Sequence, residues 1–328
     1  MSNRTKLILL MGLTIASILF FLLFKLGLHW EYLFSDWDKF TEDSAYAFNK
    51  RWYKIIAMVI AGSAIAFSTV IFQTVTHNRI LTPSIIGLDW LFLLVQTLLI
   101  YFLGCRNYAM IINEWIFSIS IRTLVAFSVI LFKIMLGKEG RSVYFLLLMG
   151  IIMGALFNSL STFMQVLIDP NEFLIAQDKM FASFNNVQVK LIVWAAIILV
   201  VTCIAFIPFI RYLDVLSLGR DQSVNLGVSY QAVVSISLVV VAILTALSTA
   251  LVGPITFLGL LVVNLTYEIF KTYKHSVLII GSILVSIIAL AFGQLIVERI
   301  FTFSTTLSVI INFIGGIYFI YLLLRGSK

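Results

Sequence analysis

The sequence predicts an all-α membrane protein, a polytopic bundle of about ten transmembrane helices. Hydrophobic residues make up 61% of the 328 residues and charged residues only 11%, whereas a soluble domain carries about 25% charged residues. The mean hydropathy is +1.08. This composition excludes a soluble enzyme, a disordered tail and a secreted disulfide scaffold. The net charge of +7 indicates basic loops beside a membrane and no nucleic-acid partner.

The first apolar stretch, 7–28, follows Arg4 and Lys6, as the core of a signal peptide would. Its length of about 20 residues exceeds that of such a core, and no small-residue cleavage pattern follows, so we expect an uncleaved span. The later stretches lack the period-2 alternation of a barrel, and backbone groups in lipid must be satisfied internally, so each is predicted to be a helix. The ten predicted spans are 7–28, 54–75, 85–103, 115–137, 143–168, 189–210, 230–252, 254–270, 276–297 and 306–325.

An even number of spans places both termini on one side of the membrane. Lys and Arg are more frequent in the loops on the side of the N-terminus, which predicts that both termini are cytoplasmic. The larger outer loops are then 29–53, which is acidic and aromatic, and 169–188, while the main inner loop is 211–229. The whole chain, 1–328, forms a single transmembrane domain in this interpretation.

The chain lacks the motifs of an enzyme. It has no G-x-x-x-x-G-K-[ST] phosphate-binding loop, so it does not hydrolyse ATP by that route. Its two cysteines and three histidines are far apart in the sequence, which predicts no metal site. No catalytic constellation is recognisable, and we expect neither a catalytic residue nor a cofactor.

Ionisable residues inside the predicted spans are scarce, although ion-coupled carriers usually bury them there. Arg122 lies inside 115–137 and is open to two interpretations: its guanidinium reaches the membrane interface, or it serves a pore or a partner. The polar residues within spans are mostly uncharged and serve either helix packing or a translocation path. The path candidates are Ser68, Gln73, Asn158 and Gln165.

Three local features suggest contacts or breaks. The segment 214–228 mixes apolar and polar residues and predicts a short amphipathic helix that docks on a soluble partner or lies on lipid. Gly253-Pro254 interrupts an apolar run, so the chain must turn or kink there. Arg51 and Lys54 share one helix face at an outer end, where they anchor headgroups or dock a partner.

Two segments resemble a known family. The first runs from Arg51-Trp-Tyr-Lys54 through Ala61-Gly-Ser-Ala64 to Phe72-Gln73, Asn78, Pro83 and Gly87. The second contains Leu218-Gly-Arg-Asp, Leu226-Gly-Val and Val252-Gly-Pro-Ile-Thr-Phe-Leu-Gly-Leu260. Together they are similar to the FecCD-type permeases of bacterial iron-siderophore and vitamin B12 ABC importers. The stretches 82–89, 178–184 and 257–264 look closest to the second permease of ferric catecholate-type siderophore importers. The chain departs from the wider family at Val263-Asn264, Tyr267 and Gly315-Gly316-Ile317.

The resemblance implies roles for particular residues. It implies that 211–229 is the cytoplasmic loop that couples to the ATPase, through Asp214, Leu218, Gly219, Arg220, Asp221, Leu226 and Gly227. It implies a re-entrant helix break at Gly253 and Pro254, and docking of a binding protein at Arg51, Lys54 and, more weakly, Arg299.

The resemblance also implies the function. The chain is expected to be a transport subunit in the bacterial plasma membrane that moves a ferric siderophore inward by ATP-driven alternating access. Expected partners are a second, different permease, two cytoplasmic ATPase subunits and an extracytoplasmic substrate-binding protein. The alternatives are an importer of the same architecture for haem or a corrinoid, and a secondary carrier.

Overall fold

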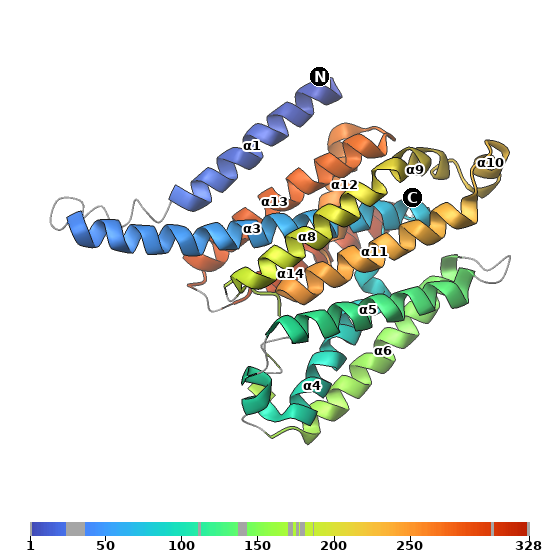
Figure 1. The fold of residues 1–328 in the computed structure, drawn as a ribbon. Coiled ribbons are helices and arrows are strands. Elements are labelled where there is room, and N and C mark those ends of the chain that lie inside the picture. The colour runs from blue at the N-terminus through green and yellow to red at the C-terminus, as the bar shows by residue number, and fades with distance from the viewer. Residues whose placement is uncertain are drawn as a thin grey trace.

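The computed structural model describes residues 2–23, 37–110, 113–136, 143–169, 173–174, 177, 181–185, 187–302 and 305–326. Every regular element within these ranges is a helix (Figure 1). The ten long ones are α1 (Asn3–Leu23), α3 (Trp37–Thr76), α4 (Leu88–Met110), α5 (Asn113–Leu136), α6 (Val143–Leu167), α8 (Val189–Phe206), α11 (Tyr230–Val252), α12 (Leu258–Phe270), α13 (His275–Arg299) and α14 (Leu307–Gly326). The short ones are η2 (Pro83–Ile86), η3 (Ile207–Phe209), α9 (Ile210–Leu216) and α10 (Arg220–Asn225).

The predicted fold class is confirmed. Each of the ten predicted spans overlaps one long helix, in the same order along the chain. Within the described residues, seven helices are long and apolar enough to cross a membrane, and three shorter apolar helices accompany them. The shorter ones are Leu88–Gly104, Leu258–Phe270 and Leu307–Leu322.

Helix α3 extends well beyond its predicted span. The sequence placed residues 29–53 in an outer loop, but α3 already begins at Trp37 and has 40 residues, a length of about 60 Å. Hydropathy marks where a chain enters lipid and not where its helix begins. No glycine or proline occurs between Trp37 and Ala61, so nothing in that stretch breaks the helix before it leaves the membrane.

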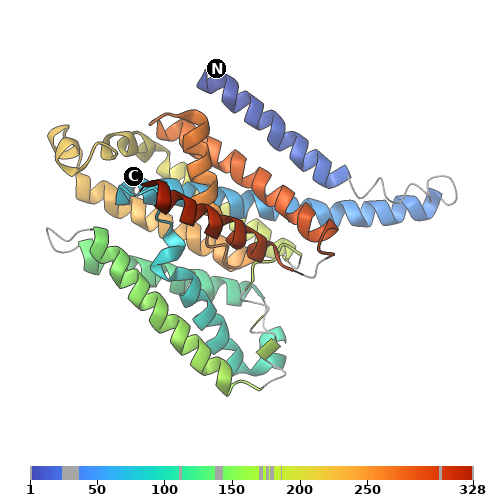
Figure 2. The ribbon, with the colours of Figure 1, turned by 180° about the vertical axis from the view of Figure 1, so that it is seen from behind.

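The C-terminal half of α3 forms the centre of the bundle. It packs most extensively against α11 and α13, and it also contacts α8 and α12. Ala61, Ala64, Val70 and Ile71 on α3 are completely buried, as expected for a helix that is apolar on all sides. Helices α4, α5 and α6 lie together along one flank of this centre, with α4 packed against α6 and α5 against α11 (Figures 1 and 2).

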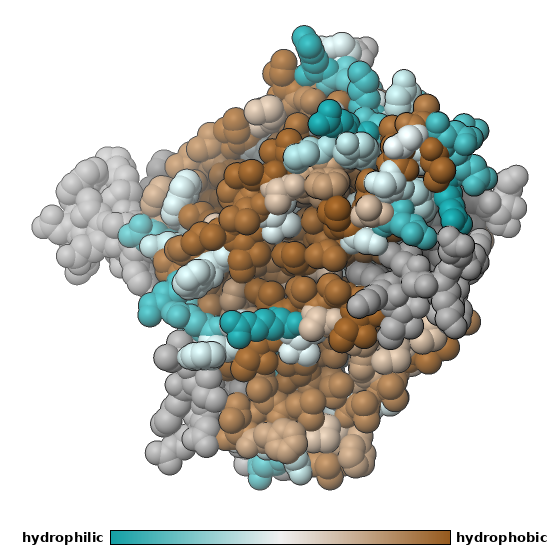
Figure 3. All heavy atoms as spheres, turned by 45° about the vertical axis from the view of Figure 1, so that its right-hand side comes forward, coloured by the Kyte–Doolittle hydropathy of each residue, from teal (hydrophilic) through white to brown (hydrophobic). Residues whose placement is uncertain are grey.

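The two ends of the bundle differ. Both views show the N-terminus, the end of α14 and the short helices α9 and α10 at one end, and the start of α3 at the other (Figures 1 and 2). We refer to these as the inner and outer ends. Figure 3 shows an apolar surface over most of one face, with many of the hydrophilic residues toward its borders. Such a band suits the lipid-facing surface of a membrane protein.

Candidate functional site

The inner segment 211–229 contains two short helices where the sequence predicted one. Helix α9 ends at Leu216 and α10 begins at Arg220, with Gly219 between them at a φ of +100°. The Ser223 hydroxyl donates toward the carbonyls of Gly219 (2.7 Å) and Val215 (3.0 Å). These contacts join α10 to α9, so the two helices form one folded unit.

This unit has a buried side and an exposed side. Leu213 and Leu216 are fully buried against the bundle, whereas Leu218 and Leu226 are about 60% exposed, at 60% and 62%. Arg220, Asp221 and Gly227 are exposed as well. Apolar and charged side chains therefore lie together on the exposed side of this unit. The predicted coupling residues lie on this surface, except Asp214 and the half-buried Gly219.

The side chain of Asp214 contacts His275, the first residue of α13. The Oδ1 atom of Asp214 accepts hydrogen bonds from the backbone N–H of His275 (2.8 Å) and from its Nδ1 (2.6 Å). On the other side of the ring, Nε2 lies 2.8 Å from the hydroxyl of Thr74 on α3. His275 is only 3% exposed. Sequence reasoning missed His275, because a lone histidine 61 residues from Asp214 gives no local signal.

The same inner end holds the turn after α3. The Gln73 side chain donates to the carbonyl oxygen of Arg79 (2.7 Å), and Asn264 of α12 donates to that oxygen too (2.9 Å). The guanidinium carbon of Arg79 lies 4.4 Å from the ring centroid of Tyr267, a cation–π contact. Asn264 and Tyr267 therefore both hold this turn.

At the outer end, Glu298 of α13 binds two cations of α3. Its carboxylate oxygens lie 2.9 Å from Nη2 of Arg51 and 3.0 Å from Nζ of Lys54. All three side chains are at most 10% exposed. Arg51 also donates to the Phe21 carbonyl oxygen of α1 and stacks on the Phe21 ring. This ion triad joins α1, α3 and α13 inside the chain.

The triad bears on the predicted docking residues. Arg51 and Lys54 are buried and paired with Glu298, so in this conformation neither presents its charge to an outside partner. Arg299, which follows Glu298, is exposed at the same end. The docking assignment stays a prediction, and of the three residues only Arg299 is accessible here.

The predicted break at Gly253-Pro254 is present in the backbone. Helix α11 ends at Val252, Gly253 has a φ of +94°, and the next helix begins only at Leu258. The irregular stretch is held by neighbours: the Ser183 N–H donates to the Val252 carbonyl oxygen (2.9 Å), and the Phe257 N–H donates to Asn312 Oδ1 (3.4 Å). Irregular backbone at membrane depth needs such partners, because lipid supplies none.

Behind this break lies a small pocket lined largely by hydroxyl groups. Its walls include Ser68, Thr69, Thr82, Thr245 and Thr249. Thr256, also in the wall, donates to Oδ2 of the buried Asp89 (2.9 Å).

The four predicted path residues separate into two groups. Ser68 is 1% exposed at the hydroxyl-lined pocket, and Gln73 is 2% exposed at the turn it holds, so neither contacts an open path in this conformation. Asn158 and Gln165 lie half-buried on α6, and Gln165 donates to the Ser161 hydroxyl (3.2 Å). The assignment of all four to a path stays a prediction.

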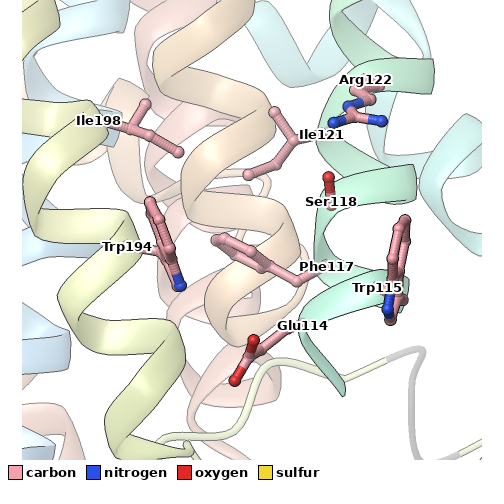
Figure 4. A pocket seen from close by; sticks show the side chains of 8 residues that line it. All are labelled: Glu114, Trp115, Phe117, Ser118, Ile121, Arg122, Trp194 and Ile198. Atoms are coloured by element: carbon pink, nitrogen blue, oxygen red, sulfur yellow. The ribbon is translucent and has the colours of Figure 1, made fainter. Parts of the chain in front are cut away.

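A wider pocket of about 510 Å³ lies along α5 and α8. Phe117 and Ile121 of α5 point toward Trp194 and Ile198 of α8, while Arg122 lies on the other flank of α5 (Figure 4). Arg122 is exposed. Both interpretations of this residue therefore remain open. Within the described residues, no group of three or more His, Cys, Asp or Glu side chains could hold a metal ion.

The long helices of the described residues form one bundle, with the short unit α9–α10 at one end and a backbone break at Gly253-Pro254 between α11 and α12. The sequence matches the FecCD transport family over residues 8–325, so the chain belongs to that family. The predicted resemblance is thereby confirmed.

Relatives of known designation agree with this membership. The petrobactin import system permease protein YclO of Bacillus subtilis is 55% identical over 328 residues, which are 100% of this chain and 99% of YclO. A second permease of that system, YclN, is 25% identical over 88% of this chain and 89% of its own. The solved structure of an inward-facing metal-chelate type ABC transporter has a TM-score of 0.81 at 18% identity, covering 99% of this chain and 100% of that one. That structure supports the fold alone.

Proposed function

We propose that this chain is one of two different permease subunits of an ABC importer that brings ferric petrobactin, an iron–siderophore complex, into the cytoplasm. The observation that carries the proposal is the 55% identity to YclO along the whole of both chains. The similarity to YclN supports a second, different permease as partner, since both relatives are named for one system. The chain itself is a transport subunit, and we assign ATP hydrolysis to two cytoplasmic subunits and delivery of the cargo to an external binding protein.

We also propose how the chain is oriented in the membrane and how its parts are organised. The inner end, with both termini and the unit α9–α10, faces the cytoplasm. Residues 1–328 act as a single permease domain, and 211–229 is its coupling loop. The exposed leucines Leu218 and Leu226, beside Arg220 and Asp221, offer apolar and charged groups of the kind that dock in a groove on a soluble subunit.

Uptake of iron tests the proposed cargo. Cells with and without this chain would be given radiolabelled iron as ferric petrobactin, as a hydroxamate complex or as citrate, with haem and cobalamin as controls. We expect only petrobactin-bound iron uptake to depend on the chain, and an ATPase-dead partner to abolish it equally. Loss of haem or cobalamin uptake instead would reassign the cargo. Uptake that survives the dead ATPase but collapses with the proton gradient would contradict the ABC assignment.

Charging the exposed face of the coupling unit should uncouple it from the ATPase. In the double variant Leu218→Asp and Leu226→Asp we expect uptake to fall at least tenfold and co-purification of the ATPase to be lost, because a buried interface would have to accept two unpaired carboxylates. The protein should still fold, since both side chains are exposed. The matched control is Tyr273→Asp, a 75% exposed side chain of the inner end outside the unit. Equal loss in the control would contradict the role of the unit.

A further inference from the structure

His275 occupies a junction between three elements that the proposed function requires to move together. It begins α13, its Nδ1 contacts Asp214 of α9 at 2.6 Å, and its Nε2 contacts Thr74 of α3 at 2.8 Å. The ring is almost completely buried, whereas the Asp214 side chain is 38% exposed. The chain of contacts thus starts at the inner surface and ends in the centre of the bundle.

The hydrogen-bond chemistry of the three groups allows both contacts at once. A carboxylate only accepts, so Nδ1 of His275 carries a hydrogen and donates it to Asp214. The Nδ1 contact places the hydrogen of neutral His275 on Nδ1, so Nε2 then accepts from the Thr74 hydroxyl; in the charged ring Nε2 donates to it. Thr74 has one hydroxyl hydrogen, which the Val70 carbonyl oxygen (2.8 Å) also accepts. The backbone N–H of His275 donates to the same carboxylate oxygen, which fixes Asp214 to the first turn of α13.

On the surface side, the contact is anchored in a stiff unit. Asp214 lies in α9, and Ser223 of α10 bonds back to the Val215 and Gly219 carbonyls. Leu213 and Leu216 seat α9 against the bundle with no exposed surface. A displacement imposed on the exposed side of α9–α10 therefore moves Asp214 as well, because the unit is rigid.

On the interior side, the contact reaches two transport helices. Thr74 belongs to α3, whose preceding turns carry Ser68 and Thr69 of the hydroxyl-lined pocket. The turn that follows α3 is bound to α12, because Asn264 of α12 donates to the Arg79 carbonyl oxygen (2.9 Å). Helix α12 begins just after the break at Gly253-Pro254. Apolar contacts can slide over one another, but this polar chain holds one register between α9, α3 and α12.

We propose that His275 is a positioning residue that transmits displacement of the coupling unit to α3 and α12. This inference rests on the proposed function, because it presumes that an ATPase acts on α9–α10. His275 touches no cargo and no nucleotide. Its role is to keep the docking surface and the transport helices in one register while the complex changes conformation.

The test uses the assembled complex of both permeases, the ATPases and the binding protein, reconstituted in vesicles. The variants are His275→Phe, which fills the site but has neither ring nitrogen, and Thr74→Val, in which a methyl group of similar size replaces the hydroxyl. We expect the ATPase rate to stay within about twofold, iron transport to fall at least tenfold, and the ATP consumed per iron to rise accordingly. The double variant should be no worse than His275→Phe alone, because both substitutions cut the same link.

The matched control is Thr202→Val. Thr202 is also buried in a long helix, and its hydroxyl donates to the Ile198 carbonyl oxygen (2.7 Å), as that of Thr74 does to Val70 (2.8 Å). The two substitutions therefore remove the same bond within a helix and differ in the contact with His275. Transport and ATPase rate should both be unchanged in this control. Proportional loss of the two rates in the His275 and Thr74 variants, or additive losses in the double variant, would show a role in stability alone and overturn the inference.

A second readout separates this inference from the cargo assignment. Spin labels at Gln222 on α10 and at His77 after α3, both exposed, report the distance between α10 and the end of α3. In the otherwise unchanged protein we expect a narrow distribution that ATP does not broaden, and a broad one in His275→Phe and Thr74→Val. Narrow distributions in the variants overturn the inference. Failure of the unsubstituted complex to carry ferric petrobactin, with the distances behaving as expected, overturns only the cargo.

Discussion

Replacing Glu298 by alanine is expected to destabilise the protein by about 3–5 kcal/mol, because it removes the carboxylate that two buried cations contact. Arg51 and Lys54 are 5% and 8% exposed and both contact this one carboxylate. The apparent melting temperature in detergent and the amount of folded protein in membranes should both fall sharply. Replacing all three residues by methionine should restore much of the loss, since a buried ion cluster exchanged for apolar side chains is often neutral.

The comparison variant is Glu114→Ala. Glu114 pairs with Lys190 at 3.4 Å, but the lysine side chain is 80% exposed, and exposed pairs contribute about 0–1 kcal/mol. We expect a small change there, measured in the same melting experiment. Equal effects of Glu298→Ala and Glu114→Ala would mean that water solvates the triad and that it does not hold α3 to α13.

The triad bears on the proposed docking of a binding protein on this chain. The sequence placed Arg51 and Lys54 on one helix face, and that spacing is correct, but the face is turned toward α13. An acidic group on a binding protein would have to replace Glu298 to reach either cation. Arg299 is exposed at the same end, and its replacement by glutamate should weaken complex formation with the proposed binding protein about tenfold or more in a pull-down titration.

The apolar composition of the chain made most of the fold predictable. Long apolar runs have one structural solution in lipid, so ten spans could be placed from the sequence and each contains a helix. The same signal gives no boundary where a helix leaves the membrane, which is why the extension of α3 to Trp37 was missed. It also places polar residues in a span without telling which neighbour they contact. Ser68 and Gln73 were predicted to line a path for that reason.

Contacts between distant parts of the chain were beyond sequence reasoning. Glu298 lies 247 residues from Arg51, and His275 lies 201 residues from Thr74. Neither pair follows a local spacing rule, because its geometry depends on how whole helices pack. Gly253-Pro254 was predictable, because both residues carry their conformational consequences in their own chemistry.

Replacing Gly253 by alanine is expected to be among the most damaging single-methyl changes in the chain. Its φ of +94° is strained for any residue with a side chain, at about 1–3 kcal/mol. An added Cβ would also lie 3.0 Å from the Ala182 Cα and 3.2 Å from the Phe181 carbonyl oxygen. Both neighbours are backbone, so the segment 181–183 would have to move and would strain the Ser183–Val252 hydrogen bond.

Gly316→Ala is the matched control, because a Cβ there meets no atom within 4 Å and the residue lies inside α14. Alanine favours a helix interior over glycine by about 1 kcal/mol, so this variant should melt at the same or a higher temperature. Gly253→Ala should melt several degrees lower and expose the break between α11 and α12 to proteolysis. If the two variants melt alike, the backbone at residue 253 relaxes without cost, and the break is a flexible hairpin rather than a rigid feature of the fold.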